Sequence, residues 1–516
     1  MSSKPAVLLL QAASLAICSY IAYVVYRFRA RDAAYRRQRR LRNCRFPAKL
    51  PTLDPLFGLD FFYSSYVSLK EHRALSLIPD MYKIISSNTG QLRLFNRTII
   101  STCEPENLKS VLSLDFKSWA LPAERSKMLG PILGEGIFTS NGEVWKHSRE
   151  MLRPNFVRTQ VGDTELFERH VQDLFQKIPR DRSMIDLQKP FLGLTLDIST
   201  EFLFGMSTNC LKPSFRDEKV AGFVESFDYV LANSAGQESK WGILGLFLPN
   251  FTAKKNIRVI HGTFSPSLLS QQKLTTTHHS FCRRPDPNRN LQLQPLPARK
   301  YIFLHALLAQ TPPPTPLRLR SELLNILLAG RDTTASVLSN LWFEISKRPD
   351  IFAALQREIL PLRNAHPTFE QLKSLKYLQA VISESQRLYP IVPENSRVAI
   401  ADTQLPVGGG RDGKSPVFAP KGRLVHWSIY AMHRRKDLFG EDAEEFKPER
   451  WLDGADGSKG LRTGWEYLPF SGMYSSEVLL PRMCRMFIAR HGKGRSSEIF
   501  CGPEYTFKHR PLTIFA

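Results

Sequence analysis

The stretch LLNILLAGRDTTAS, residues 323–336, lies inside the longest helical pattern of the chain. That pattern runs from about Arg318 to Lys347, after a block of prolines, and stops before Pro349. Its first half is rich in leucine, as a buried helix requires, but its centre is polar. A long buried helix with polar residues at its centre is the feature from which the fold and the chemistry of this chain can be predicted.

The centre of this helix combines small residues with an acid and a hydroxyl. Ala329 and Thr333 are four residues apart and share one helix face, and Gly330 weakens the helix by about 1 kcal/mol relative to alanine. A locally opened groove beside Asp332 and Thr333 suits a small bound molecule and a proton path. The alternative is a glycine kink in which the hydroxyls bond back to the backbone.

A second motif pairs a carboxylate with a guanidinium. LQAVISESQRLYP places Glu384 and Arg387 three apart on a helix that ends before Pro390, so the two side chains can pair on one face. Farther on, FKPERWLDG supplies Arg450 in an irregular segment. Taken alone, the pair could also be an ordinary surface ion pair.

A third motif, NGEVWKHSREMLRPNF, puts Trp145 and Arg149 four apart on one helix face. An indole N–H and a guanidinium fork side by side are the donors that a carboxylate-bearing ligand requires.

In chain order these pieces, WxxxR, AGxDTT, ExxR, PERW and YLPFSG, resemble the cytochrome P-450 family of haem-thiolate monooxygenases. The resemblance runs from the N-terminal apolar segment to about Gly472. It implies a mainly α fold with a small β subdomain, with the haem domain over residues 56–472. LLNILLAGRDTTAS and LDPLFGLDFF look most like the fungal alkane and fatty-acid omega-hydroxylases.

The resemblance also implies cofactors, partners and roles. It implies haem b iron as cofactor, an NADPH-dependent reductase as partner, dioxygen, and an apolar substrate such as a fatty acid or n-alkane. The implied roles are the following: proton delivery, Asp332 and Thr333; oxygen groove, Ala329 and Gly330; structural triad, Glu384, Arg387 and Arg450; haem-propionate donors, Trp145, Arg149 and Arg397.

The haem-ligand loop departs from the family pattern, F-x-x-G-x-R-x-C-x-G. Counted from Phe470, the four fixed positions after it should be Gly, Arg, Cys and Gly. This chain has Met473, Ser475, Glu477 and Leu479 there. The cysteine thiolate that should hold the iron is therefore missing from its expected position, Glu477.

Two explanations of this departure stay open. In the first, the loop is enlarged and PRMC, which ends at Cys484, supplies the ligand, although the glycines around the cysteine are absent. In the second, the chain is translated through an unspliced intron after Gly472, so that residues 473–516 are an aberrant tail. The product would then be catalytically inactive and unable to ligate haem.

The N-terminus reads as a membrane anchor. Pro5 to Tyr26 carries no charge over 22 residues, which as a helix is about 33 Å long, enough for a bilayer core. Arg27 to Arg42 holds eight arginines and one acid, which predicts a cytosolic flank. We expect an anchor over 1–27, a basic Pro-rich linker over 28–55, and single-pass insertion in the endoplasmic reticulum membrane; a secretory signal is the rival.

About a third of the net charge of +23 lies in this flank, which adjoins the apolar segment, so we expect no nucleic-acid partner. Seven scattered cysteines give no disulfide framework, and the spacing of His491, Cys501 and His509 matches no zinc finger. The segment 261–300 is anomalous: it has one acid, six Lys or Arg and five prolines, and no helical period. It is either a disordered surface insertion or a local frame error.

Overall fold

The structure is a computed structural model that forms two compact units, each described by itself. It describes residues 19, 22–23, 26, 36–37, 39–54, 58–94, 97–156, 164–179, 185–212, 218–234, 250–263, 302–362, 369–454 and 457–469. The first unit comprises Met1–Asp60, Asp80–Trp119 and Arg397–His426, and the second comprises Phe61–Pro79, Ala120–Ser396 and Trp427–Ala516.

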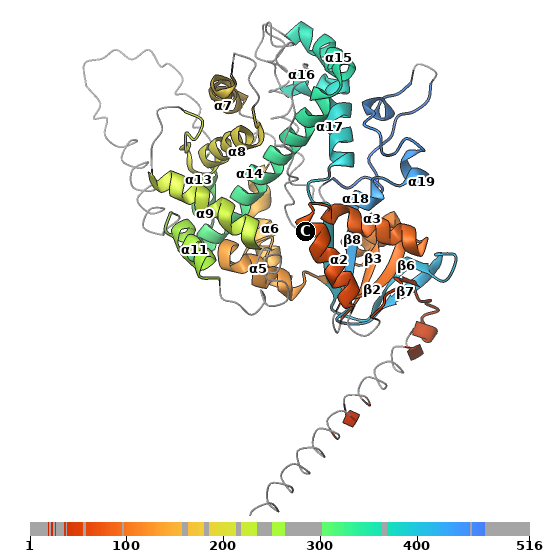
Figure 1. Cartoon of the computed structure of the whole chain (residues 1–516). Helices are drawn as coiled ribbons and strands as arrows, with labels where there is room; N and C mark the ends of the chain where they lie inside the picture. The colour runs from red at the N-terminus through yellow and green to blue at the C-terminus, as the bar shows by residue number, and fades with distance from the viewer. Residues whose placement is uncertain are drawn as a thin grey trace, which may run out of the picture. The chain divides into compact units, whose positions relative to one another are not determined.

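The chain has two sheets, whose strands lie largely in the first unit (Figure 1). One has six strands in the order β1-β2-β3-β8-β5-β4, and the other pairs β6 with β7. β2 and β3 are antiparallel, with Thr89 opposite Thr102, and β1 joins β2 in parallel. The strands are β1 (Ala48–Lys49), β2 (Thr89–Leu94), β3 (Arg97–Thr102), β4 (Trp119–Ala120), β5 (Glu394–Ala399), β6 (Thr403–Gly409), β7 (Ser415–Ala419) and β8 (Leu424–Ser428).

Helices build the second unit, and short helical turns join its longer helices. Its main helices are α5 (Ala123–Leu133), α6 (Gly142–Leu152), α7 (Thr164–Lys177), α8 (Gln188–Phe204), α9 (Glu218–Ser234), α11 (Phe251–Thr263), α13 (Phe303–Leu308), α14 (Pro316–Ser346), α15 (Pro349–Ile359), α16 (Phe369–Ser374) and α17 (Lys376–Leu388). Shorter pieces are η3 (Arg153–Phe156), η5 (Leu360–Leu362), α18 (Ile429–Met432), α19 (Lys436–Phe439) and η6 (Pro448–Trp451). The remaining helical elements precede β4 in the chain: α2 (Leu59–Lys70), α3 (Ala74–Ile85), α4 (Pro105–Lys109), η1 (Ser110–Leu114) and η2 (Phe116–Ser118).

The long central helix predicted from the sequence is α14. Thr315 caps its N-terminus by accepting a hydrogen bond from the Arg318 amide at 3.3 Å, and Pro316 occupies the first turn, where its missing N–H costs nothing. α14 packs on α5, α8, α15 and α17, and its side chains enter both hydrophobic clusters of the unit. The predicted bounds, about 318 to 347, agree with the structure to within two residues.

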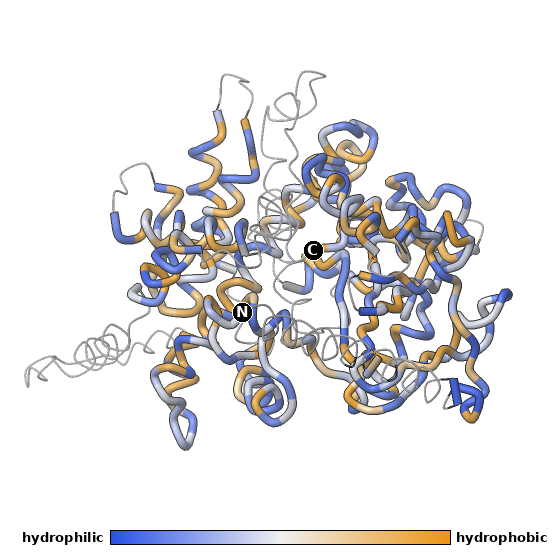
Figure 2. The backbone as a smooth tube through the Cα atoms, turned by 60° about the horizontal axis from the view of Figure 1, so that its bottom comes forward, coloured by the Kyte–Doolittle hydropathy of each residue, from blue (hydrophilic) through white to orange (hydrophobic). Residues whose placement is uncertain are grey.

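The prediction of a mainly α fold with a small β subdomain is confirmed (Figure 1). In Figure 2 orange and blue segments alternate along the helices, as expected when one face packs inside the unit and the other faces water. The sequence prediction for 261–300 is wrong at its start, because residues 261–263 form the last turn of α11 and Ile260 of the same helix is buried. The rest of that segment lies outside the described residues.

Within the part of the chain that the structure describes, no helix combines the length and the apolar character needed to span a bilayer. Only four residues of the expected anchor are described, namely Ser19, Ala22, Tyr23 and Tyr26. The anchor therefore stays a prediction from the sequence.

Candidate functional site

The centre of α14 presents one accessible stripe. Between residues 321 and 338 every position is buried except four, which follow the spacing i, i+3, i+4, i+7 of a single helix face. The four half-buried residues are Ile326, Ala329, Gly330 and Thr333. The structure thus brings both predicted groove residues and the predicted hydroxyl onto one open face.

The predicted acid lies beside this stripe and not on it. Asp332 is 4% exposed, and its Oδ1 accepts a hydrogen bond from Arg331 Nη1 at 3.0 Å. Burial raises the pKa of Asp332 to about 6; the charge of Arg331 opposes this rise, whereas the charge of Asp228 adds to it. Asp332 is therefore a carboxyl that changes protonation close to neutral pH.

Gly330 has a packing role that the sequence did not suggest. α14 continues through it without a break, and a Cβ at this position would lie 2.9 Å from Ser199 Oγ on α8. The glycine therefore permits the close approach of α8. The alternative predicted from the sequence, in which hydroxyls bond back to the helix backbone, is present in part, since Thr333 Oγ1 donates to the Ala329 carbonyl.

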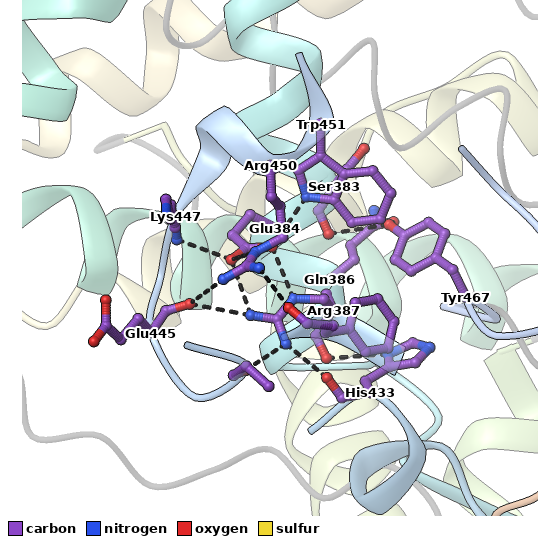
Figure 3. Close-up of polar contacts among 12 residues, drawn as sticks. Ser383, Glu384, Gln386, Arg387, His433, Glu445, Lys447, Arg450, Trp451 and Tyr467 are labelled. Carbon is purple, nitrogen blue, oxygen red and sulfur yellow. Dashed lines mark hydrogen bonds and ion pairs between the residues drawn. The ribbon is translucent and has the colours of Figure 1, made fainter. Parts of the chain in front are cut away.

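The predicted carboxylate–guanidinium pair on α17 is completely buried, so the surface alternative is wrong (Figure 3). Arg387 donates to the Glu384 carboxylate through Nε at 2.8 Å and through Nη2 at 2.9 Å. Its remaining donors reach the carbonyl oxygens of His433, Ala443 and Glu445 at 2.6, 2.6 and 3.1 Å. Each of its N–H groups thus has an acceptor.

Arg450 completes the predicted triad. Its Nε donates to Glu384 Oε1 at 2.9 Å, and its other nitrogens bind Asp442 and the Phe439 carbonyl. Glu384 also accepts from the Lys447 amide at 2.8 Å and from Trp451 Nε1 at 3.0 Å, neither of which was assigned a role from the sequence (Figure 3). Burial alone would raise the pKa of Glu384, but the hydrogen bonds and charge of Arg387 lower it.

His433 extends this triad cluster to the start of the ligand loop. Nδ1 lies 3.0 Å from the Arg387 carbonyl and Nε2 lies 3.0 Å from the Leu468 amide, so the neutral tautomer with hydrogen on Nδ1 satisfies both partners. Burial lowers the pKa of His433 to about 3. Its ring stacks on Tyr467 at a centroid distance of 5.3 Å. We refer to Glu384, Arg387, Arg450, Trp451 and His433 as the α17 cluster.

The predicted propionate donors lie together on α6. Arg149 is exposed and its guanidinium carbon is 5.5 Å from the centre of the half-buried Trp145 ring, while Ser148, Met151 and Leu152 face inward. Arg318 of α14 donates to the Val144 carbonyl at 3.1 Å and to Ser148 Oγ, which fixes α6 against α14.

These described residues fit a haem with its two carboxylates: α6 offers an exposed guanidinium and an indole N–H, and α14 offers an open stripe of small residues. Arg397 lies on β5 in the first unit, so its predicted role as a third donor stays a prediction. Cys484, the expected ligand position Glu477, and the set His491, Cys501 and His509 lie outside the described residues. Among the described residues no group of His, Cys, Asp and Glu side chains could hold a metal ion.

Comparison with known proteins gives a consistent result. The sequence model of the family described as cytochrome P-450 matches residues 66–472. The cytochrome P-450 monooxygenase himC of Aspergillus japonicus is 39% identical over 478 residues, which cover 92% of this chain and 81% of the relative. Cytochrome P-450 52A5 of Candida maltosa is 36% identical over 85% of this chain and 82% of its own length. Cytochrome P-450 52A1 of Candida tropicalis is 39% identical over 77% of this chain and 70% of its own length.

Proposed function

The chain belongs to the cytochrome P-450 family of monooxygenases, and on that premise we propose that it hydroxylates a fatty acid or an n-alkane with dioxygen. The observation that carries this proposal is the accessible stripe on α14, which sets a hydroxyl on an open face beside a buried acid of raised pKa. When bound, haem iron with a cysteine thiolate would supply the activation of dioxygen. Trp145 and Arg149 would hold the haem carboxylates.

Asp332 and Thr333 would move the protons. With a pKa of about 6, the Asp332 carboxyl can take a proton and give it up near neutral pH, as a proton carrier requires. Thr333 Oγ lies on the open face and can hold a proton toward a molecule bound there once it leaves the Ala329 carbonyl. Ala329 and Gly330 keep that face free of bulky side chains.

The substrate class rests on the resemblance of LLNILLAGRDTTAS to the fungal alkane and fatty-acid hydroxylases. An apolar substrate is consistent with an enzyme attached to a membrane, and the apolar Pro5–Tyr26 and the basic Arg27–Arg42 support such an attachment. We place the catalytic domain on the cytosolic side of the endoplasmic reticulum membrane, where an NADPH-dependent reductase would supply electrons.

Reconstitution of the full chain with a reductase, NADPH and lipid tests the proposal. A long-chain fatty acid and the n-alkane of equal length are supplied separately, and hydroxylated product is measured by mass spectrometry. We expect NADPH-dependent product from at least one of them and much less from Thr333→Val. A folded, haem-loaded chain that hydroxylates neither would refute the assigned substrate class.

A second candidate, a membrane-anchored product that cannot ligate haem, is favoured by one observation. Met473, Ser475, Glu477 and Leu479 replace all four fixed residues of the family loop after Phe470. Sequencing mature transcripts across the codons for Gly472 and Met473 tests whether a retained intron is the cause. An uninterrupted frame excludes the retained intron, and a splice junction at this point establishes it.

A further inference from the structure

Arg331 lies between two carboxylates from different helices of the second unit. Its Nη1 is 3.0 Å from Asp332 Oδ1, the next residue on α14, and its Nη2 is 2.7 Å from Asp228 Oδ1 on α9. The side chains of Arg331 and Asp332 are 2% and 6% exposed, whereas that of Asp228 is 48% exposed. One guanidinium thus connects a buried acid to a carboxylate at the surface.

The guanidinium is held mainly by these two contacts. Its carbon lies 5.6 Å from the centre of the buried Phe227 ring, and its Nε is buried without a hydrogen-bond partner. Two negative charges share one positive charge, so the attraction of Asp228 for Arg331 competes with that of Asp332. The position of α9 on α14 therefore affects how strongly the acid is held.

The other ionisable groups near this part of α14 already have partners. Gly330 adjoins α8, whose buried acids are Asp197 and Glu201. Asp197 accepts hydrogen bonds from Thr208 and from the amides of Cys210 and Leu211, and Glu201 pairs with Arg169 and His170. Cys210 is a thiol whose pKa burial raises, so it carries no competing charge at neutral pH. Among the described residues, Asp228 is therefore the carboxylate that shares Arg331 with Asp332.

We propose that Asp228 is a positioning residue for proton delivery: it holds Arg331 from α9, so that the docking of α9 on α14 sets the orientation and charge of Asp332. The inference rests on the proposed function, in which Asp332 is the proton carrier. When α9 moves away, Arg331 is left to Asp332 alone and the carboxyl is held in its ionised form. Seating of α9 returns the acid to the state in which it can carry a proton.

Four variants of the full chain test this proposal. Asp228→Asn removes the charge and Asp228→Glu preserves it. Glu225→Gln removes an equal charge from an exposed position of the same helix. Asp332→Asn shows which part of the pH dependence of stability is due to Asp332. The first readout needs no haem: the chemical-denaturation midpoint is measured from pH 4 to pH 7, and the part of its pH dependence that Asp332→Asn abolishes is assigned to Asp332.

Because the charge of Asp228 raises the pKa of Asp332, Asp228→Asn should lower the pH at which the stability contribution of Asp332 is lost. Asp228→Glu and Glu225→Gln should leave it in place. The second readout is product formed per NADPH consumed, which should fall severalfold in Asp228→Asn and recover in Asp228→Glu. If Asp228→Asn behaves like Glu225→Gln in the denaturation readout, the control of Asp332 by Asp228 is wrong. Absence of product from every variant, wild type included, would instead refute the proposed function, and with it the role of this control in proton delivery.

Discussion

The centre of α14 and the α17 cluster are both buried and ionic, but their charges are balanced to different degrees. In the α17 cluster one carboxylate faces two guanidinium groups, and Arg387 donates every N–H. At the centre of α14, Asp332 and Asp228 of the neighbouring α9 share the single guanidinium of Arg331, and a half-buried stripe runs alongside. A cluster in which every carboxylate and N–H group has a partner maintains the fold. A cluster with fewer guanidinium groups than carboxylates leaves a carboxyl whose protonation can change.

The two regions should also respond oppositely to acid. The folded pKa of Asp332 is raised, so its contribution to stability is complete below about pH 4 and is lost as the pH rises toward 6. The folded pKa of His433 is depressed, so its contribution is complete above its ordinary value near 6.5 and is lost as the pH falls toward 3. Variants of each region can therefore be distinguished by the sign of their pH dependence.

The largest effect is expected at Arg387. Arg387→Ala leaves the buried Glu384 charge without its main partner and removes the donors to three carbonyl groups. We expect a loss of about 3–5 kcal/mol in the free energy of unfolding, measured by urea denaturation. Arg462→Ala, which breaks an exposed pair with Asp453, is the matched control and should change little. A loss below about 1 kcal/mol at Arg387 would contradict the view that this cluster maintains the fold.

The next effect is expected at His433. His433→Phe keeps a ring against Tyr467 but leaves the Leu468 amide and the Arg387 carbonyl without their partner. We expect a loss of about 1–3 kcal/mol at pH 7 that shrinks as the pH falls toward 4, because acid also weakens the wild type at this site. Faster hydrogen exchange at Leu468 should accompany it. An unchanged hydrogen-exchange rate at the Leu468 amide would show that His433 does not position the loop.

Asp332→Asn should shift stability in the opposite sense. The variant removes a buried charge whose pKa lies about two units above its ordinary value, so it should be more stable than wild type at pH 7 by about 2–3 kcal/mol and equal to it near pH 4. Denaturation midpoints at both pH values check this. A variant that is less stable at pH 7 would mean that the Arg331 pair outweighs the cost of burial.

Thr333→Val should affect stability least. It keeps the shape of the side chain and removes a hydroxyl on the half-buried stripe together with its bond to the Ala329 carbonyl, so we expect a change within about 1 kcal/mol. Product per NADPH should nevertheless fall severalfold, while Thr333→Ser retains most of it. If Thr333→Val lost stability but kept the wild-type yield of product per NADPH, the role of Thr333 would be structural.

Local spacing predicted α14, through leucines at helical period, and the pair of Glu384 and Arg387, which are three residues apart. Arg450 was added to the triad only through the family resemblance. The sequence did not reveal Trp451, His433 or Asp228. Their contacts join segments far apart in the chain, and a half-exposed aspartate on α9 has no pattern that distinguishes it from an ordinary surface acid. The sequence also could not show that the pair of Glu384 and Arg387 is buried, because the same i,i+3 spacing occurs in exposed ion pairs.

The central claim, that this chain is a haem-thiolate monooxygenase, is tested most directly by a reduced carbon monoxide difference spectrum. The spectrum is recorded on the full chain, on Cys484→Ser, and on Cys501→Ser as the matched control, after circular dichroism has shown that all three are folded. We predict the red-shifted Soret band of a thiolate-ligated haem in the wild type and in Cys501→Ser. The explanation in which an enlarged loop supplies Cys484 as the ligand predicts loss of the band in Cys484→Ser. A folded wild-type chain without that band would contradict the claim and identify the product that cannot ligate haem.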